Sequence, residues 1–136
     1  MRPEHLRELA GCAREVLLAA GTFPIREGDA ADTFYALRDG AVAIEVHAPS
    51  GPLVVQTLHA GDVLGWSWLF PPYRSAFDAR VVEPARALAF DAPCLRGKAE
   101  RDHELGYALM LRMARVFTSR LAATRLQLLD LYGPRA

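Results

Sequence analysis

The sequence contains almost no lysine and carries no excess of either charge. Lys98 is the single lysine among 16 basic residues, and 16 acidic residues balance them. A chain without net charge lacks the electrostatic attraction on which nonspecific binding to nucleic acids and anionic membranes depends. The composition therefore favours neither kind of partner.

Long hydrophobic runs are also missing. The uncharged stretch 46–61 is interrupted by Pro49-Ser50-Gly51-Pro52, and the stretch 63–73 is too short to cross a bilayer. The N-terminus does not resemble a secretory signal, because glutamates precede its first apolar run and a proline interrupts that run. We expect no association with a membrane.

Cysteines and histidines are few and scattered. Cys12 and Cys94 form neither a C-x-x-C motif nor a disulfide framework, so the expectation is two reduced thiols in a cytoplasmic protein. The histidines lack metal-ligand spacing, and no Ser-His-Asp or Cys-His arrangement is evident. We therefore predict neither a metal site nor an enzyme. The four histidines are His5, His47, His59 and His103.

The chain begins with a helical pattern. Apolar residues recur at three- and four-residue steps through 3–20, and Gly21 is a suitable C-terminal stop. This spacing predicts one amphipathic helix over 3–20, within an N-terminal segment 1–21. The apolar positions are Leu6, Leu9, Ala10, Ala13, Val16, Leu17 and Ala20.

The segment 22–91 has the pattern of short strands separated by turns. Turn signals recur every 8–12 residues, which is typical of a sandwich or barrel rather than of β-α-β units. The Asp39-Gly40 pair predicts a hairpin turn. With helices at both chain ends, the class is α+β, a β-roll or jelly roll of about eight short antiparallel strands. The expected strands include 22–25, 33–37, 41–46, 53–58, 77–82 and 86–90.

The segment 92–132 is predicted to be helical. Asp91 can cap a short helix that contains Pro93 in its first turn, and a long helix follows over about 101–132. Its length, roughly 45 Å, exceeds what one small domain needs. We favour a homodimer in which a second copy covers its apolar stripe. A following domain, or the helix lying on its own sheet, are the alternatives. The stripe comprises Leu105, Leu109, Met113, Val116, Phe117, Leu121, Leu128 and Leu131.

An aromatic stretch without periodicity, 64–76, lies between the strands. It combines two tryptophans, a phenylalanine and a tyrosine with two prolines, and ends in Arg74-Ser75-Ala76. A rigid aromatic segment with one isolated cation, set in a β scaffold, indicates a ligand cradle.

These residues together resemble the cyclic nucleotide-binding domain of the catabolite activator protein (Crp/Fnr-like) family. The similarity rests on the Glu27-Gly28-Asp29 turn, on Phe34-Tyr35 leading to Gly40, on Gly61-Asp62 leading to Gly65, and on Arg74-Ser75-Ala76. It covers nearly the whole chain and implies a single domain over 1–136. It also implies that 64–76 is the family's phosphate-binding cassette, with cAMP or another cyclic nucleotide as a ligand.

The chemistry of such a cassette can be assigned to particular residues. Gly65 would let the backbone approach a phosphate closely, and Arg74 would present a fork of donors to its oxygens. Ser75 would add a hydroxyl, and Ala76 would stay small beside the ligand. The alternative for Arg74 is a surface arginine stacked on Tyr73 or Trp68.

The sequence also departs from the family pattern. The glutamate that usually takes the ribose hydroxyl is replaced by Trp66, followed by Ser67, and an indole has no acceptor. Losing that acceptor costs on the order of 1–3 kcal/mol, roughly a tenfold to hundredfold loss of affinity. Either the ligand differs, or Trp66 fills the pocket, or a cyclic nucleotide binds weakly. Thr124 and Arg125 are the positions that would meet the base, unless Thr124 is merely tolerated there.

Two functions follow. The first is a stand-alone regulatory domain that binds a small phosphorylated ligand and signals to a partner protein. Because the family's helix-turn-helix does not follow the long helix within these residues, we expect no DNA binding through this chain alone. The second is a ligand-free version of the fold, acting as an interaction module or accessory subunit. Its apolar surface would comprise Trp66, Trp68, Phe70, Pro71, Pro72 and Tyr73.

Overall fold

The computed structural model describes residues 2–132, and their side chains as far as Ala122. They belong to two compact units, Met1–Lys98 and Ala99–Ala136. The first unit contains the seven described strands, which confirms the α+β class and the β-roll, with seven strands where about eight were expected. In chain order the elements are α1 (Pro3–Ala10), β1 (Ala13–Leu18), β2 (Thr33–Leu37), β3 (Ala41–Ala48), β4 (Gly51–Leu58), β5 (Val63–Leu64), η1 (Ser67–Leu69), β6 (Asp78–Glu83), β7 (Ala85–Asp91), α2 (Ala92–Arg101) and α3 (His103–Tyr132).

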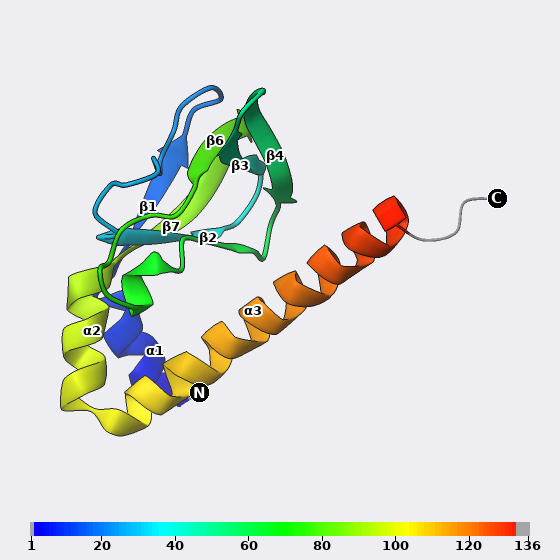
Figure 1. The fold of residues 1–136 in the computed structure, drawn as a ribbon. Helices are drawn as coiled ribbons and strands as arrows, with labels where there is room; N and C mark the ends of the chain where they lie inside the picture. Colours follow the sequence, from blue (N-terminus) through cyan, green and yellow to red (C-terminus); the bar gives the residue numbers. More distant parts are fainter. Residues whose placement is uncertain (1, 133–136) are drawn as a thin grey trace. The chain divides into compact units, whose positions relative to one another are not determined.

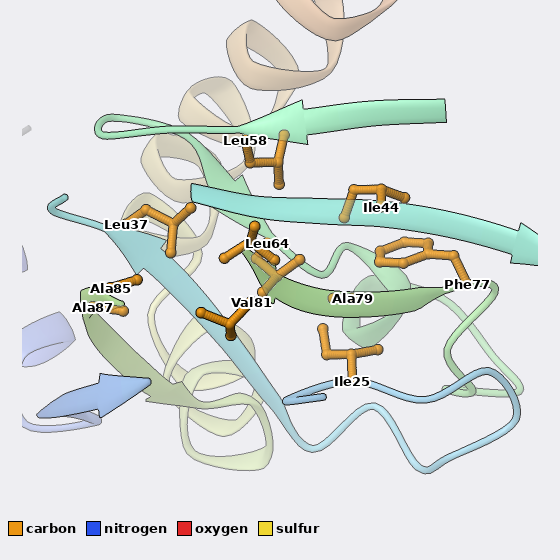
Figure 2. Close-up of a cluster of buried hydrophobic side chains, with 11 residues drawn as sticks. Ile25, Leu37, Ile44, Leu58, Leu64, Phe77, Ala79, Val81, Ala85 and Ala87 are labelled. Atoms are coloured by element: carbon orange, nitrogen blue, oxygen red, sulfur yellow. The ribbon is translucent and has the colours of Figure 1, made fainter. Parts of the chain in front are cut away.

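The strands form two antiparallel sheets (Figure 1). One has the order β1-β7-β2-β5 and the other β4-β3-β6. Figure 2 shows side chains from both sheets pointing toward one another, among them Leu37, Ile44 and Val81. These residues are almost fully buried, so the hydrophobic core lies between the sheets. The core cluster comprises Ile25, Leu37, Val42, Ile44, Leu58, Leu64, Phe77, Ala79, Val81, Ala85 and Ala87.

The first helix is shorter than the sequence predicts. It ends at Ala10, and Ala13–Leu18 is strand β1, so the prediction of a helix over 3–20 is wrong beyond Ala10. The register pairs Ala13 with Phe90 and Leu18 with Ala85 along β7. β1 pairs with a strand roughly 70 residues away in the sequence. This pairing overrides the local helical spacing, because the backbone of β7 offers hydrogen-bond partners along the whole of β1.

The turn at Asp39-Gly40 is correctly predicted, but it does not make a hairpin. Gly40 has φ +83°, and the Asp39 carboxylate accepts hydrogen bonds from the backbone N and the Nε of Arg86. β2 and β3, on either side of the turn, belong to different sheets. The turn therefore carries the chain from one sheet to the other. In the predicted strand 22–25, a single bridge joins Ile25 to Ala79.

The two cysteines are joined, contrary to the expectation of separate thiols. Cys12 and Cys94 form a disulfide across 82 positions of sequence. Cys12 immediately precedes β1, and the N–H of Asp91 at the end of β7 donates to the Cys12 oxygen at 2.8 Å. The β1–β7 pairing thus brings Cys12 beside the start of α2, which carries Cys94. Spacing along the chain contains no sign of this proximity.

The predicted helices after β7 are present. The Asp91 carboxylate accepts a hydrogen bond from the Cys94 N–H at 3.0 Å, which confirms it as the cap of α2. Asp102 caps α3 in the same way through the N–H groups of Glu104 and Leu105. No helix in the described part of the chain is long and apolar enough to span a membrane. The side chains of Thr124, Arg125, Leu128 and Leu131 lie outside the described residues.

Candidate functional site

The stretch 64–76, called the cassette below, begins at a glycine in a left-handed conformation. Gly65 has φ +93°, and a Cβ atom there would lie 3.1 Å from Cδ1 of the buried Ile25. Only glycine satisfies both the backbone conformation and this close approach to the core. The chain then forms η1, a short helical turn.

Trp68, within η1, fixes the cassette to the first sheet. Its side chain is 1% exposed and stacks on Phe34 of β2, with ring centroids 4.9 Å apart. Phe34 stacks in turn on Phe90 of β7 at 4.8 Å. The Trp68 indole N–H has no hydrogen-bond partner among the described side chains and backbone. Ring stacking, rather than a hydrogen bond from the indole, therefore holds this side chain.

Arg96 of α2 holds the cassette from its other side. Its Nη1 donates to the backbone oxygen of Trp68 at 2.7 Å, and its guanidinium lies 4.3 Å from the ring centroid of Tyr73. Tyr73 has φ 55°, a conformation that residues other than glycine rarely adopt. The sequence also allows Arg74 to be a surface cation stacked on Tyr73 or Trp68. That alternative is wrong for the described residues, in which Arg96 covers Tyr73.

The end of the cassette pairs with the Glu27-Gly28-Asp29 turn. The Gly28 N–H donates to the Ser75 oxygen at 2.8 Å, and the Ser75 N–H donates to the Asp29 oxygen at 2.9 Å. A β-bridge joins Ala30 to Arg74 beside them. The Glu27-Gly28-Asp29 turn and the end of the cassette thus form one local structure, although Gly28 and Arg74 are 46 residues apart in the sequence. Both carry the family resemblance.

Arg74 is exposed, and most of its N–H donors make no hydrogen bond within residues 2–122. Its Nη1 donates to the Gly28 oxygen at 3.2 Å, and among residues 2–122 no carboxylate pairs with it. By contrast, Arg38, Arg80 and Arg86 form ion pairs with Glu15, Glu45 and Asp39. A guanidinium has five N–H groups, so most of those on Arg74 are available to an anion.

The other predicted site residues differ in exposure. Ser75 is half-buried and Ala76 is exposed beside Arg74, whereas Ser67 is buried. Trp66 is 38% exposed, whereas Trp68 two positions later is 1% exposed. Gly65, Arg74, Ser75 and Ala76 all lie in the segment between β5 and β6.

A charged pair that the sequence analysis missed braces the same turn. The buried Asp78 accepts hydrogen bonds from the Glu27 N–H at 2.7 Å and from His47 Nε2 at 2.8 Å. The backbone hydrogen bond from Glu27 is the main cause that lowers the pKa of Asp78. The hydrogen bond to Asp78 is the main cause that raises the pKa of His47. Both shifts favour the ion pair.

The matched region of the chain identifies its family. Residues 15–102 match the family model described as cyclic nucleotide-binding domain. The chain belongs to the cyclic nucleotide-binding domain family. The match begins in β1 and includes the cassette and α2. A search of curated proteins gave no match.

Solved structures of cyclic nucleotide-binding domains share this fold. A structure described as a cyclic nucleotide-binding protein from Geobacter metallireducens is 26% identical, with TM-score 0.81, over 89% of this chain and 88% of that one. A cyclic nucleotide-binding domain from Methylobacillus flagellatus is 16% identical, with TM-score 0.86, over 99% and 76%. The catabolite activator protein of Thermus thermophilus is 22% identical, with TM-score 0.71, over 96% and 61%.

Arg96 of α2 is the main support of the cassette that the sequence did not reveal. Its role depends on the approach of α2 to η1, and the two lie 28 positions apart in the sequence. An arginine on a capped helix shows no local sign of such a contact. The sequence offers one indirect indication of such a contact, namely that the aromatic rings and backbone carbonyls of 64–76 need partners.

Proposed function

We propose that the cassette binds the phosphate of a cyclic nucleotide and that this cytoplasmic domain passes its occupancy to a partner protein. The observation that carries the proposal is the exposed guanidinium of Arg74, which is anchored at the Gly28 oxygen and has no carboxylate partner among residues 2–122. Gly65 and Ser75 lie in the same loop. Arginine suits a phosphate because its planar fork matches two phosphate oxygens.

Trp66 sets the expected affinity. Its ring is 38% exposed and therefore accessible to a ligand at the surface of the roll. It supplies no acceptor for a ribose hydroxyl, however, because the indole carries only an N–H donor. Cyclic AMP is therefore expected to bind roughly tenfold to hundredfold more weakly than to a domain with a carboxylate at this position.

Calorimetric titration with cyclic AMP and cyclic GMP tests the proposal. Arg74→Ala should abolish the binding heat, whereas Arg38→Ala should leave it unchanged because Arg38 pairs with Glu15 at the turn between the sheets. Trp66→Glu restores a carboxylate and should tighten binding by about tenfold to hundredfold. If neither nucleotide gives a binding heat with the natural chain or with Trp66→Glu, the assignment is overturned.

We also propose that α3 mediates homodimer formation. Of the stripe expected from the sequence, Leu105, Leu109 and Met113 are buried, which the expectation of a second copy covering them did not foresee. Leu121 is exposed on the described part of α3, together with three large apolar side chains outside the expected stripe, Tyr107, Met110 and Leu111. A second copy is a suitable cover for such a stripe. Sedimentation equilibrium of the natural chain and of Leu111→Glu/Leu121→Glu checks this assembly, which should dissociate in the variant.

A ligand-free interaction module is the second candidate, favoured by one observation. Phe70 of the cassette is 61% exposed, next to two exposed prolines. Trp68 does not belong to this surface, because it is buried. The titration above separates the two candidates, since an interaction module gains no nucleotide affinity from Trp66→Glu.

A further inference from the structure

Helix α2 is attached on one side to the junction of α1 and β1. The Cys12–Cys94 disulfide makes one attachment. Lys98 makes another, since its Nζ donates to the Glu8 oxygen at 2.6 Å and lies 3.4 Å from the Glu8 carboxylate. Positions 94 and 98 are four residues apart and therefore share one face of the helix. Figure 1 shows the yellow-green α2 beside the blue α1.

The opposite side of α2 carries the residue that holds the cassette. Arg96 lies two positions after Cys94, about 200° around the helix. From there it donates to the Trp68 oxygen and covers the ring of Tyr73. The first turns of α2 thus connect the disulfide directly to the cassette. All of these contacts lie within the unit Met1–Lys98.

We propose that the Cys12–Cys94 pair is a reversible thiol–disulfide switch that sets the ligand affinity of the cassette through Arg96. The proposal rests on the function proposed above and specifies its regulation. With the disulfide formed, α2 is held against the α1–β1 junction and Arg96 is fixed on Trp68. With the thiols reduced, the first turn of α2 is released on that side, and the cassette loses a fixed support.

The electron donor is a dithiol of the thioredoxin class. Its thiolate attacks Sγ of Cys94, which is partly exposed, whereas Cys12 is 6% exposed. The sulfur–sulfur bond breaks, Cys12 leaves as a thiolate and takes up a proton, and a mixed disulfide joins Cys94 to the donor. The donor's second thiol then displaces Cys94. The products are two protein thiols and the oxidised donor, so two electrons and two protons have been transferred.

A reversible pair also agrees with the proposed cellular location. Disulfides that persist in a reducing cytoplasm are uncommon, and those that form there usually serve in redox sensing or catalysis. Reduction leaves the fold other ties in this region. The Asp91 N–H still donates to the Cys12 oxygen, and the Ala92 N–H still donates to the Asp32 oxygen at 2.9 Å. Local release of α2 is therefore expected, rather than unfolding.

The experiment compares the oxidised and the dithiothreitol-reduced full chain by amide hydrogen exchange and by titration with cyclic AMP. Reduction should speed exchange in peptides that cover 64–75 and leave β3 and β6 protected. It should also weaken cyclic AMP binding by about fivefold or more. Cys12→Ser/Cys94→Ser should behave as the reduced chain under all conditions.

The Arg96 variant tests the route of coupling. In Arg96→Ala the cassette should exchange rapidly in both redox states, so the effect of reduction should vanish. Arg101→Ala, on the same helix, is the matched control and should retain the full effect. Equal cassette exchange in the two redox states, a redox effect that survives Arg96→Ala, or loss of protection throughout the sheets on reduction would each overturn the proposal.

The outcomes also separate this proposal from the proposed function. Cyclic AMP binding of equal strength in both redox states supports the function and overturns the switch. Redox-dependent and Arg96-dependent cassette exchange without any nucleotide binding supports the conformational coupling and overturns the ligand assignment.

Discussion

The guanidinium of Arg96 and the backbone oxygen of Trp68 form a hydrogen bond of 2.7 Å. Because Arg96 also covers Tyr73, one side chain of α2 contacts both the helical turn and the last part of the cassette. The charge on the donor strengthens this hydrogen bond to a partly buried carbonyl, which ties α2 to the loop.

The first prediction follows from this hydrogen bond. Arg96→Ala should lower the free energy of unfolding by about 1–3 kcal/mol, because the Trp68 oxygen loses a charged donor. Arg96→Lys keeps the charge but not the planar stacking on Tyr73, and its loss should be smaller. Urea unfolding checks both variants beside Arg101→Ala. Equal stability of all three would contradict a role for Arg96 in holding the loop.

The second prediction concerns the stacked rings. Phe34 lies between Trp68 and Phe90, and it is 4% exposed. Phe34→Ala should cost about 3–5 kcal/mol and should also release Trp68 from its stacked position. In a Trp66→Phe background, Trp68 is the only fluorophore of its type, so its emission should shift to the red. Unchanged emission would show that Trp68 is held by something other than Phe34.

The third prediction uses two glycines with nearly the same backbone conformation. Gly65 has φ +93° and Gly61 has φ +90°, but a Cβ would meet Ile25 only at Gly65. In each alanine variant the left-handed conformation lowers the free energy of unfolding by about 1–2 kcal/mol. Gly65→Ala should lose about 1 kcal/mol or more in addition, because the core must move.

Thermal unfolding of the two alanine variants measures this difference. The Gly61 variant serves as the matched control for the conformational cost alone. If both variants melt at the same temperature, the approach of Gly65 to Ile25 does not limit the position of the cassette.

The fourth prediction is the pH dependence of the His47–Asp78 pair. The pKa of His47 is raised, so the folded state binds this proton more tightly than the unfolded state. The stabilisation is therefore fully present below the ordinary value of 6.5 and is lost as the pH rises through the raised pKa of the folded state. The pKa of Asp78 is lowered from 3.8, so its contribution is present above that value and is lost as the pH falls through the lowered pKa.

Melting temperatures across these two ranges check the prediction. Stability should decline from pH 6 upward to pH 8, and His47→Gln should flatten that decline. The neighbouring charges are Glu27, 3.7 Å from His47 Nε2, and Arg26. Glu27→Gln should therefore reduce the upward shift of the His47 pKa in an NMR titration. A decline of the same size in His47→Gln would assign it to another group.

Much of the roll could be predicted from local patterns. The run of β-forming residues at 33–37 coincides with β2, and the glycines at the expected turns have positive φ. Asp91 caps α2 as its position before Pro93 indicates. These features are encoded by neighbours in sequence, through side-chain periodicity, restricted φ angles and capping oxygens.

The cassette was predictable only in part. Gly65 has the left-handed conformation that its close approach to the core requires, and Arg74 is exposed. Which tryptophan is buried could not be read from the sequence, because Trp66 and Trp68 are flanked by similar residues. Stacking on Phe34 decides the matter by burying Trp68, while Trp66 remains exposed.

By itself, then, the sequence determined the fold class and the family, because both depend on local conformation and on motif order. Tertiary structure alone decided that Ala13–Leu18 is a strand, that Cys12 reaches Cys94, and that Arg96 supports the loop. The physical reason is common to all three. Each depends on the pairing of β1 with β7 or on where α2 then packs, and such contacts between distant segments leave no period in the chain.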